Sequence, residues 1–346
     1  MNCNPANLLA GIDNLLLDER KFDTSRDDIE RICRFFSIGK LRHYEKEKGI
    51  IVSHSNFFVF VATAQGQYAL KFYPLNDAKS IAIEYAINRI LNNHHFPIPV
   101  MYAGHGGKPF MTSNDLLATC YSYIDGVPLW QNIKEPKTIP KINAAMLSLK
   151  NILSTAMGRV PLQKQANFTA TINSLVQESR SMSPYDQKKM IDASLQEAFQ
   201  TYRELQLSFT RQLVHNNITL TNMLIFEKTV HILDLSHIRE DYALSDLASL
   251  ILSCLFFDIP LTTIKAIAKN YFTQHKIETN HFLILNVLIK IGLCREYLKN
   301  IQREKSVELS NNPPELVSTY AAHLSKRKKS ITTVLKKIND NPRLIV

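Results

Sequence analysis

A short polar motif in the second half of the chain constrains its fold more than any other feature. The motif runs from His215 to Asn222, and Asp234 follows twelve residues later, after a segment typical of a tight hairpin. An amide oxygen and a carboxylate at opposite ends of a short hairpin can converge on one ion, and hard oxygen ligands suit Mg²⁺. The residues before Asp234 are largely apolar, so a carboxylate there is unusual unless it binds something. We therefore expect Asn222 and Asp234 to be metal ligands; the alternatives are a turn residue and a strand-end cap.

Length and composition favour a large protein with two lobes. The chain has 346 residues, of which 45% are hydrophobic, and this predicts a sizeable core. The most apolar run, residues 282–294, is too short and too polar to cross a membrane. The N-terminus shows no secretory signal. The five cysteines are scattered and without paired spacing, which indicates reduced thiols and a cytoplasmic location rather than a zinc site.

The net charge of +10 is concentrated at the C-terminus. Residues 326–346 hold seven Lys or Arg and one Asp, and they overlap a helix expected at about 314–338. A basic amphipathic helix can lie on an anionic membrane or bind phosphates of nucleic acid. Such a face is more often simply solvated. We therefore expect no DNA or RNA partner, and at most a weak contact of this helix with anionic surfaces.

The order of expected elements is a β-rich first part followed by a helical second part. The first part is expected to hold a capped helix at 27–36, strands at 37–45, 50–63 and 67–73, a helix at 77–93, and strands at 108–113 and 116–124. The helix at 77–93 would bury Ile83, Ile87 and Ile90/Leu91. The second part is expected to hold helices at 139–157, 165–182, 184–208 and from 245 onward, with hairpin strands Met223–Phe226 and Thr229–Leu235 between them.

These elements predict an α+β fold in three parts. Residues 1–36 would form an N-terminal helical extension, and residues 37–126 a small β-rich lobe. Residues 127–346 would form a larger helical lobe that holds the hairpin loop 213–235 and the basic C-terminal helix.

Two charged residues of the first part are candidates for a site. Lys71 ends an alternating, aromatic-rich strand, where its ammonium could face a cleft; the alternative is an edge lysine that extends to water. Glu84, thirteen residues on in the next helix, lies beside the expected buried stripe and could pair with Lys71. Together they form a better candidate than either residue alone.

The loop itself contains residues of different expected roles. His215 follows two apolar residues, so we expect its ring to fix the loop by hydrogen bonds. Asn217 stands two residues later, and an amide cannot take up a proton at neutral pH. Asp246 begins a buried-looking helix, where it is either an N-cap or an anchor for the backbone N–H groups of the loop.

Taken together, these residues resemble the aminoglycoside/choline/homoserine phosphotransferase group of kinase-like folds, and most nearly its bacterial homoserine kinases. The loop of that group is roughly His-Gly-Asp-x-x-x-x-Asn, followed by Ile-Asp-Phe and an Asp-Leu-Ala helix. The corresponding stretches here are His215–Asn222, Leu233–Leu235 and Asp246–Ala248. Upstream similarities cover Ser53–Asn56, Gly66–Lys71, Phe96–Pro99 and Ser122–Gly126. The resemblance spans about residues 36–255 and implies a bilobal protein-kinase-like fold.

The resemblance also implies an activity and its cofactors. ATP and Mg²⁺ would be the cofactors, and the γ-phosphate would pass to a hydroxyl of a small-molecule acceptor. The implied nucleotide site comprises Lys71 on the phosphates, braced by Glu84, with Ser53, Asn56, Tyr121, Tyr123 and Ile124 around the nucleotide. Asn222 and Asp234 would hold Mg²⁺. Asn217 would stand at the position of the catalytic base, next to His215.

The departures from the pattern leave the activity open between two interpretations. Asn217 replaces an Asp, Asn216 replaces a Gly, and Ser53-His54 replace a Gly-containing loop. Loss of a general base costs roughly 10²–10⁴-fold in rate, but positioning and electrostatics dominate phosphoryl transfer. The first interpretation is an impaired or repurposed transferase, with Asp241 as a substitute carboxylate. The second is a nucleotide-binding pseudokinase with a regulatory or scaffolding role. The segments expected to form the acceptor pocket carry no acidic cluster, which favours an acceptor smaller than an aminoglycoside.

Overall fold

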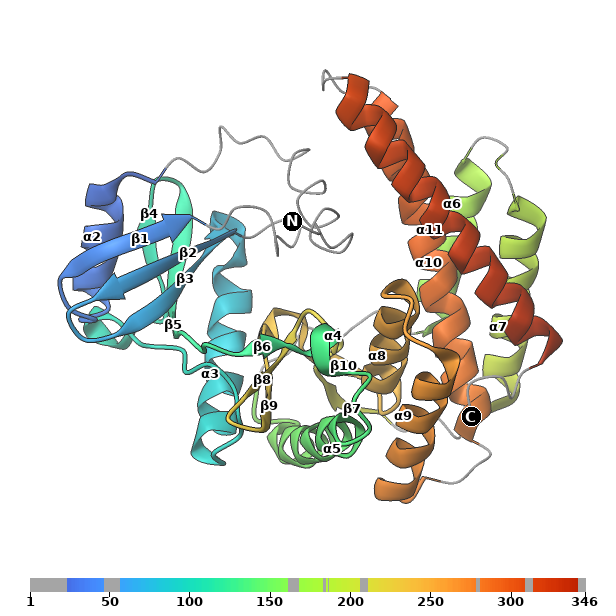
Figure 1. The fold of residues 1–346 in the computed structure, drawn as a ribbon, viewed down its shortest axis with the longest axis horizontal. Helices are drawn as coiled ribbons and strands as arrows, with labels where there is room; N and C mark the ends of the chain where they lie inside the picture. Colours follow the sequence, from blue (N-terminus) through green and yellow to red (C-terminus); the bar gives the residue numbers. More distant parts are fainter. Residues whose placement is uncertain are drawn as a thin grey trace. The chain divides into compact units, whose positions relative to one another are not determined.

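The computed structural model describes residues 24–46, 57–160, 168–182, 185, 187–205, 211–277, 281–308 and 314–341 (Figure 1). The chain divides into two compact units. The first comprises Met1–Val127, Gly158–Pro161 and Leu224–Ser236, and the second comprises Pro128–Met157, Leu162–Met223 and His237–Val346.

A five-stranded antiparallel sheet forms the body of the first unit. Its strands are arranged in the order β1-β2-β3-β5-β4. Their bounds are β1 Leu41–Lys46, β2 Phe57–Thr63, β3 Gln67–Pro74, β4 Met111–Ser113 and β5 Leu116–Ser122. This is the expected βββαββ arrangement. The central strand β3 pairs with β2 on one side and with β5 on the other, so a residue of β3 is held in a fixed register from both sides.

Helix α2 (Arg26–Phe35) packs against this sheet. A capping box starts the helix: the Ser25 hydroxyl accepts the Asp28 N–H, and the Asp28 carboxylate accepts the Ser25 N–H. Hydrogen bonds from Ser25 lower the pKa of Asp28 to about 2. Ile29 and Ile32 are fully buried in one hydrophobic core with the sheet strands, so the helix shares the core of the first unit.

The buried face of helix α3 (Ala78–Asn93) agrees with the expected stripe at Ile87 and Leu91 but begins at a different isoleucine. The residues buried on it include Ile81, Glu84, Ile87 and Leu91. The prediction of a buried Ile83 is wrong, because Ile81 fills that place and Ile83 is partly exposed. The shift puts the Glu84 carboxylate inside the buried stripe rather than beside it.

A three-stranded sheet in the order β6-β8-β9 carries the hairpin that precedes Asp234. Its strands are β6 Val127–Pro128, β8 Met223–Phe226 and β9 Thr229–Ile232. Strand β9 ends at Ile232, three residues before the expected end, and the short helix η5 (Leu235–His237) follows. Asp234 therefore lies in the connection between a strand and a helical turn.

The second unit is mainly helical. Its helices are α4 Leu129–Asn132, α5 Thr138–Ala156, α6 Phe168–Ser181, α7 Lys188–Leu205, α8 Ser245–Phe256, α9 Leu261–Gln274, α10 Phe282–Glu308 and α11 Pro314–Asp340. A short antiparallel ribbon accompanies them: β7 (Arg211–Val214) pairs with β10 (Arg239–Tyr242). The sequence prediction missed this ribbon. Both strands have only four residues; β7 (Arg-Gln-Leu-Val) is half apolar without alternation, and β10 (Arg-Glu-Asp-Tyr) carries three charges.

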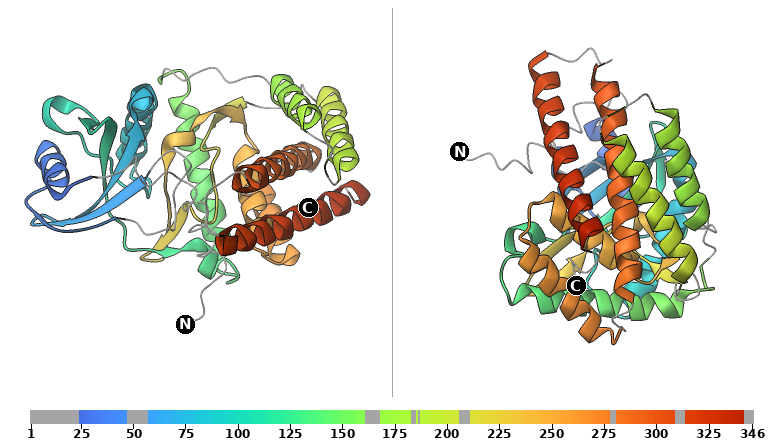
Figure 2. Two further views of the ribbon diagram at one scale, coloured as in Figure 1. Left: turned by 90° about the horizontal axis from the view of Figure 1, so that it is seen from above. Right: turned by 90° about the vertical axis from the view of Figure 1, so that its right-hand side faces the viewer.

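Helices α10 and α11 lie side by side in the second unit (Figure 2). Two cations of the basic cluster on α11 bind acids of α10: Arg327 lies 3.2 Å from Glu296, and Lys328 lies 2.6 Å from Glu304. Lys326 and Lys329 are exposed. The helix therefore offers less unneutralised charge to an external anionic surface than the sequence suggests.

The described cysteines, Cys33, Cys120, Cys254 and Cys294, are buried and free, as expected. Cys3 lies outside the described residues. Within the described ranges, no helix is long and apolar enough to cross a membrane.

Candidate active site

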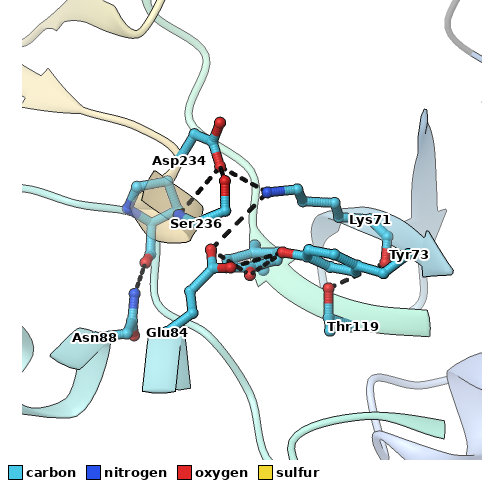
Figure 3. Close-up of polar contacts among 9 residues, drawn as sticks. Lys71, Tyr73, Glu84, Asn88, Thr119, Asp234 and Ser236 are labelled. Carbon is cyan, nitrogen blue, oxygen red and sulfur yellow. Dashed lines mark hydrogen bonds and ion pairs between the residues drawn. The ribbon is translucent and has the colours of Figure 1, made fainter. Parts of the chain in front are cut away.

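The first unit brings Lys71 and Asp234 together although 163 residues separate them in the sequence (Figure 3). Lys71 extends from β3, and its Nζ donates to Asp234 Oδ1 at 2.6 Å. The Ser236 hydroxyl also donates to Asp234 Oδ1, at 2.7 Å. The lysine side chain is 3% exposed and the aspartate side chain 16% exposed. The pair is therefore an almost fully desolvated ion pair and not a surface contact.

Glu84 lies at the same place but is held mainly by two tyrosines. Its carboxylate accepts the Tyr73 hydroxyl at 2.7 Å and the Tyr121 hydroxyl at 2.8 Å. Its Oε1 is 4.0 Å from Lys71 Nζ, which is at the limit of an ion pair. Glu84 thus acts on Lys71 through its charge more than through a direct hydrogen bond. Figure 3 shows the side chains of Lys71, Tyr73 and Glu84 converging with Asp234.

The electrostatics keep these groups in defined protonation states. Burial alone would lower the pKa of Lys71, but the carboxylates of Glu84 and Asp234 outweigh burial and raise it above its usual value. Burial, helped by the Glu84 charge, raises the pKa of Tyr73 and of Tyr121 well above the usual value. The ammonium therefore stays charged, and both hydroxyls keep the protons that they donate to Glu84.

The backbone of Asp234 is in a sparsely populated conformation. Its φ of 59° falls in the left-handed region, which non-glycine residues adopt at a cost and mostly as Asn or Asp. Residues held in such conformations cluster at functional sites, because the surrounding structure must impose them. The conformation turns the chain directly after β9 and holds the carboxylate against Lys71.

In the second unit, Asp246 anchors the polar loop. Its Oδ2 accepts the backbone N–H of His215 at 3.1 Å, and its Oδ1 accepts that of Asn216 at 2.7 Å. The residue at the N-cap of α8 is Leu244, and it makes no side-chain capping bond. Of the two expected roles, the loop anchor is therefore confirmed and the N-cap is wrong.

Burial raises the pKa of Asp246 to about 6, against the opposing effect of the two N–H donors. The folded pKa is higher than the usual value of 3.8, so the folded state binds the proton more tightly than the unfolded state. The contribution of this group to stability is greatest at low pH and is lost as the pH rises through about 6. This pKa shift lowers the free energy of unfolding by about 3 kcal/mol at neutral pH, relative to low pH.

The remaining loop residues are tied to one another. The Asn217 N–H points to His215 Nδ1 at 3.3 Å, and the Asn222 amide N–H donates to the Asn217 carbonyl at 3.0 Å. The Leu220 N–H donates to the Ser253 hydroxyl of α8 at 3.0 Å. His215 is fully buried. The imidazole therefore contributes to the shape of the loop, as its sequence context predicts.

Asn216 explains one departure from the expected pattern. Its φ is 59°, in the left-handed region that Gly adopts without strain. Asn is among the few other residues that tolerate this region. The change from Gly to Asn at this position therefore preserves the bend of the loop.

The expected adenine-facing segment follows β5. Tyr121 is buried against Glu84, whereas Tyr123 is 39% exposed. The Tyr123 N–H donates to the Gln67 carbonyl at 3.3 Å. For the Ile124 backbone N–H, the described part of the chain supplies no hydrogen-bond partner. Ile124 is thus a better candidate than Tyr123 to donate to a base. Ser53 and Asn56 lie outside the described residues.

Asp234 and Asn222 each carry an oxygen atom of the kind that binds hard divalent cations. Asp234 offers a carboxylate, and Asn222 offers an amide whose nitrogen is already engaged by the Asn217 carbonyl. Oxygen donors of this kind suit Mg²⁺, which keeps several waters or phosphate oxygens in its shell. Asn222 belongs to the second unit and Asp234 to the first. Among the described residues, there is no cluster of three or more His, Cys, Asp or Glu that would form a metal cage of its own.

Two groups at this site, Tyr73 and Ser236, were not predicted from the sequence. Tyr73 belongs to the same strand as Lys71, two residues on, but a strand tyrosine is normally a packing residue. Ser236 follows Asp234 by two residues, a spacing at which a hydroxyl can bond back to a carboxylate. That spacing is the one feature of the sequence that could have identified Ser236 as part of the site.

A buried lysine on an antiparallel sheet, a glutamate of the following helix, an aspartate after a hairpin and a loop anchored by a helical aspartate define a kinase-like fold. The model of the phosphotransferase enzyme family matches residues 49–278, which is more than half of the chain. The chain belongs to this family.

Solved structures agree with this fold. Amicoumacin kinase hAmiN, in complex with AMP-PNP, Ca²⁺ and Ami, is 13% identical with a TM-score of 0.68, covering 90% of this chain and 94% of that one. An aminoglycoside phosphotransferase from Alicyclobacillus acidocaldarius is 11% identical with a TM-score of 0.61, covering 93% and 98%. Choline kinase LicA from Streptococcus pneumoniae is 14% identical with a TM-score of 0.56, covering 88% and 100%. No curated protein matches the chain by sequence.

Proposed function

We propose that the chain transfers the γ-phosphate of ATP, with a divalent cation, to a hydroxyl of a small molecule. One observation carries this proposal: Lys71 Nζ lies 2.6 Å from Asp234 Oδ1, with Glu84 beside them. Phosphoryl transfer needs a cation on the nucleotide phosphates and oxygen ligands for a metal. The ion pair holds the two protein groups that would meet those needs.

Each residue has an assigned role in this proposal. Lys71 would bind the nucleotide phosphates, and the charge of Glu84 would keep its ammonium in place. Asp234 and Asn222 would hold Mg²⁺, which would neutralise the charge that develops on the phosphate oxygens. Ile124 would donate its backbone N–H to adenine. The roles of Ser53 and Asn56 at the phosphates stay predictions.

Asn217 cannot act as a general base, so the chain's own residues would work by positioning. The Asn217 backbone is fixed by its bonds to His215 and Asn222. The substitute carboxylate proposed from sequence, Asp241, accepts one hydrogen bond from Arg239 Nε at 2.9 Å, and Arg239 Nη2 lies 2.7 Å from the same oxygen as an ion pair. Arg239 thus already occupies this carboxylate. We therefore expect slow turnover in which the acceptor hydroxyl loses its proton to water.

The second candidate is a nucleotide-binding pseudokinase, and Asn217 is the observation that favours it. This interpretation keeps the roles of Lys71 and Asp234 in nucleotide binding but assigns no turnover to the protein. Its biological role would then be regulation or scaffolding. The acceptor type, whether homoserine-like or aminoglycoside-like, belongs only to the transferase interpretation.

A thermal-shift titration and an ADP-release assay separate these candidates. For the transferase we expect stabilisation by Mg-ATP and ADP formation that depends on an added alcohol, with Asp234→Ala as the inactive control. For the pseudokinase we expect stabilisation without ADP formation. The variant Asn217→Asp should raise turnover about 10²–10⁴-fold if only the base is missing. Failure of both the wild type and Asn217→Asp to bind Mg-ATP would refute both candidates.

A further inference from the structure

The second unit contains a cavity of about 250 Å³ beside the polar loop. Its walls come from several elements: the β7–β10 ribbon, α6, α8, α10 and Asn216 of the loop. A typical pocket for a drug-sized ligand is larger, about 300–1,000 Å³. The cavity thus suits a compact ligand, and Asn216 places it next to the residue at the expected base position.

The lining of this cavity carries an excess of positive charge. Three arginines, Arg211, Arg239 and Arg295, face one carboxylate, Asp241. Arg239 and Asp241 neutralise each other in an ion pair with one hydrogen bond. Arg211 lies at the more exposed rim, 3.8 Å from Glu240 and over the Tyr242 ring. The positive charge that remains is concentrated on Arg211 and Arg295.

Arg295 is the most informative of these arginines. It projects from α10, and the structure gives its guanidinium neither a hydrogen bond nor an ion pair with any described residue. Burial lowers its pKa, and the neighbouring Arg239 charge adds to this effect. A guanidinium nevertheless stays protonated in proteins. Arg295 is therefore a partly desolvated charge that no described residue binds by a hydrogen bond or ion pair, and this costs free energy unless an anion joins it.

The acids that could neutralise Arg295 are engaged elsewhere. Glu296 binds Lys299 and Arg327, at 3.4 and 3.2 Å. Glu178 accepts a hydrogen bond from Gln302 at 2.7 Å. Asp241 is held by Arg239. Each of these carboxylates therefore makes its direct contact with another residue, and acts on Arg295 only through its charge.

The other side of the cavity is apolar and closely packed. Leu252 of α8 and Leu288, Ile291 and Gly292 of α10 form this wall. A Cβ on Gly292 would lie 2.3 Å from Leu252 Cδ1, so the glycine permits the close approach of the two helices. A ligand here would rest its carbon skeleton on the apolar wall and direct its polar end to the ribbon.

We propose that this cavity binds the phosphate acceptor, and that the acceptor is a small acidic hydroxy compound whose carboxylate or phosphate ester is bound by Arg295, with Arg211 at the rim. This assignment rests on the proposed phosphotransferase function. In the transfer step, the acceptor hydroxyl oxygen bonds to the γ-phosphorus of ATP. The bond from that phosphorus to the bridging oxygen breaks, ADP leaves with the bonding electrons, and the hydroxyl proton passes to water. Polycationic acceptors are excluded, since they would meet guanidinium groups instead of carboxylates.

A matched set of ligands tests the charge preference. Glycerol, glycerate, glycerol 3-phosphate and serinol share a three-carbon hydroxyl skeleton and differ in charge. Isothermal titration of the full chain should give a Kd for glycerate or glycerol 3-phosphate at least tenfold lower than for glycerol or serinol. The stronger of the two anions identifies carboxylate or phosphate ester as the bound group. Equal binding of all four, preference for serinol, or no binding of either anion at saturating millimolar concentrations would overturn the proposal.

Variants at Arg295 test the assigned contact. Arg295→Gln should weaken binding of the preferred anion about 10- to 100-fold, as expected for loss of a charge-assisted hydrogen bond. Arg295→Lys should retain part of the affinity. Arg180→Gln, at an exposed arginine of α6, is the matched control and should bind like the wild type. Equal affinity of Arg295→Gln and wild type would refute the contact.

Stability measurements separate ligand binding from a structural role. Because Arg295 has no partner among the described residues, Arg295→Gln should leave the ligand-free melting temperature unchanged or raise it. A marked decrease would assign Arg295 to the fold and overturn the proposal. The ADP-release assay distinguishes failure of the acidic-acceptor proposal from failure of the proposed transferase function. Turnover with serinol but not with the anions refutes the acidic acceptor and keeps the transferase, whereas Arg295-dependent anion binding without Mg-ATP binding refutes the transferase.

Discussion

The Lys71–Asp234 ion pair allows a quantitative test of the site. At 2.6 Å, two unit charges attract by about 6 kcal/mol at an effective dielectric constant near 20. Desolvation of the nearly buried ammonium offsets much of this attraction. Removal of one partner of a buried pair costs roughly 3–5 kcal/mol. Asp234 is partly exposed and keeps its bond from Ser236, so we expect Lys71→Met to lower the free energy of unfolding by about 3 kcal/mol, the low end of that range.

A double-mutant cycle isolates the pair itself. Asp234→Asn should cost about 2 kcal/mol, and the double variant should cost about 2 kcal/mol less than the sum of the single changes. Urea unfolding followed by far-UV circular dichroism measures these values. Lys79→Met, at an exposed lysine of α3, is the matched control and should cost less than about 0.5 kcal/mol.

The result that refutes this reasoning is a small coupling energy. A value below about 0.5 kcal/mol would mean that the pair contributes no more than a solvent-exposed salt bridge. Trp130, the single tryptophan of the chain, belongs to the second unit. Its fluorescence therefore reports whether a change at Lys71 remains confined to the first unit.

Three further predictions concern stability. Asp246→Asn should remove a pH dependence of unfolding between about pH 4 and 6; identical pH dependence of variant and wild type would contradict the raised pKa of this carboxyl. Gly104→Ala should cost about 1–3 kcal/mol in urea unfolding, because its Cβ would lie 2.1 Å from the Phe35 ring, and Phe35→Leu should relieve part of that cost. Arg327→Ala removes the ion pair with Glu296 and should speed amide hydrogen exchange in α11; unchanged exchange would count against that ion pair as its anchor.

Local patterns in the sequence were sufficient for the elements with strong periodicity. The alternation of Gln67–Tyr73 predicted β3, and the spacing in 77–93 predicted α3. Sequence also identified the loop from His215 to Asn222 and the family resemblance that the family match confirms. These features depend on residues close together in the chain, so their signals are visible without a structure.

The two short strands of the ribbon were not predicted, because their stability comes from pairing with each other. Arg211–Val214 and Arg239–Tyr242 have little β signal alone, and each becomes a strand only beside the other. The helical position of Ile81 was missed for a related reason. The helical period alone predicts an apolar stripe, but the surface against which α3 packs decides whether Ile81 or Ile83 is buried.

The sequence alone determined the family, the order of the elements and the identity of the polar residues, because motif spacing and apolar period are properties of the linear chain. Only the tertiary structure decided that Asp246 anchors the loop and that Lys71 meets Asp234. It also decided that Arg295 faces a cavity with every neighbouring carboxylate engaged elsewhere. Such facts depend on which groups are desolvated together, and desolvation is set by contacts between residues far apart in the chain.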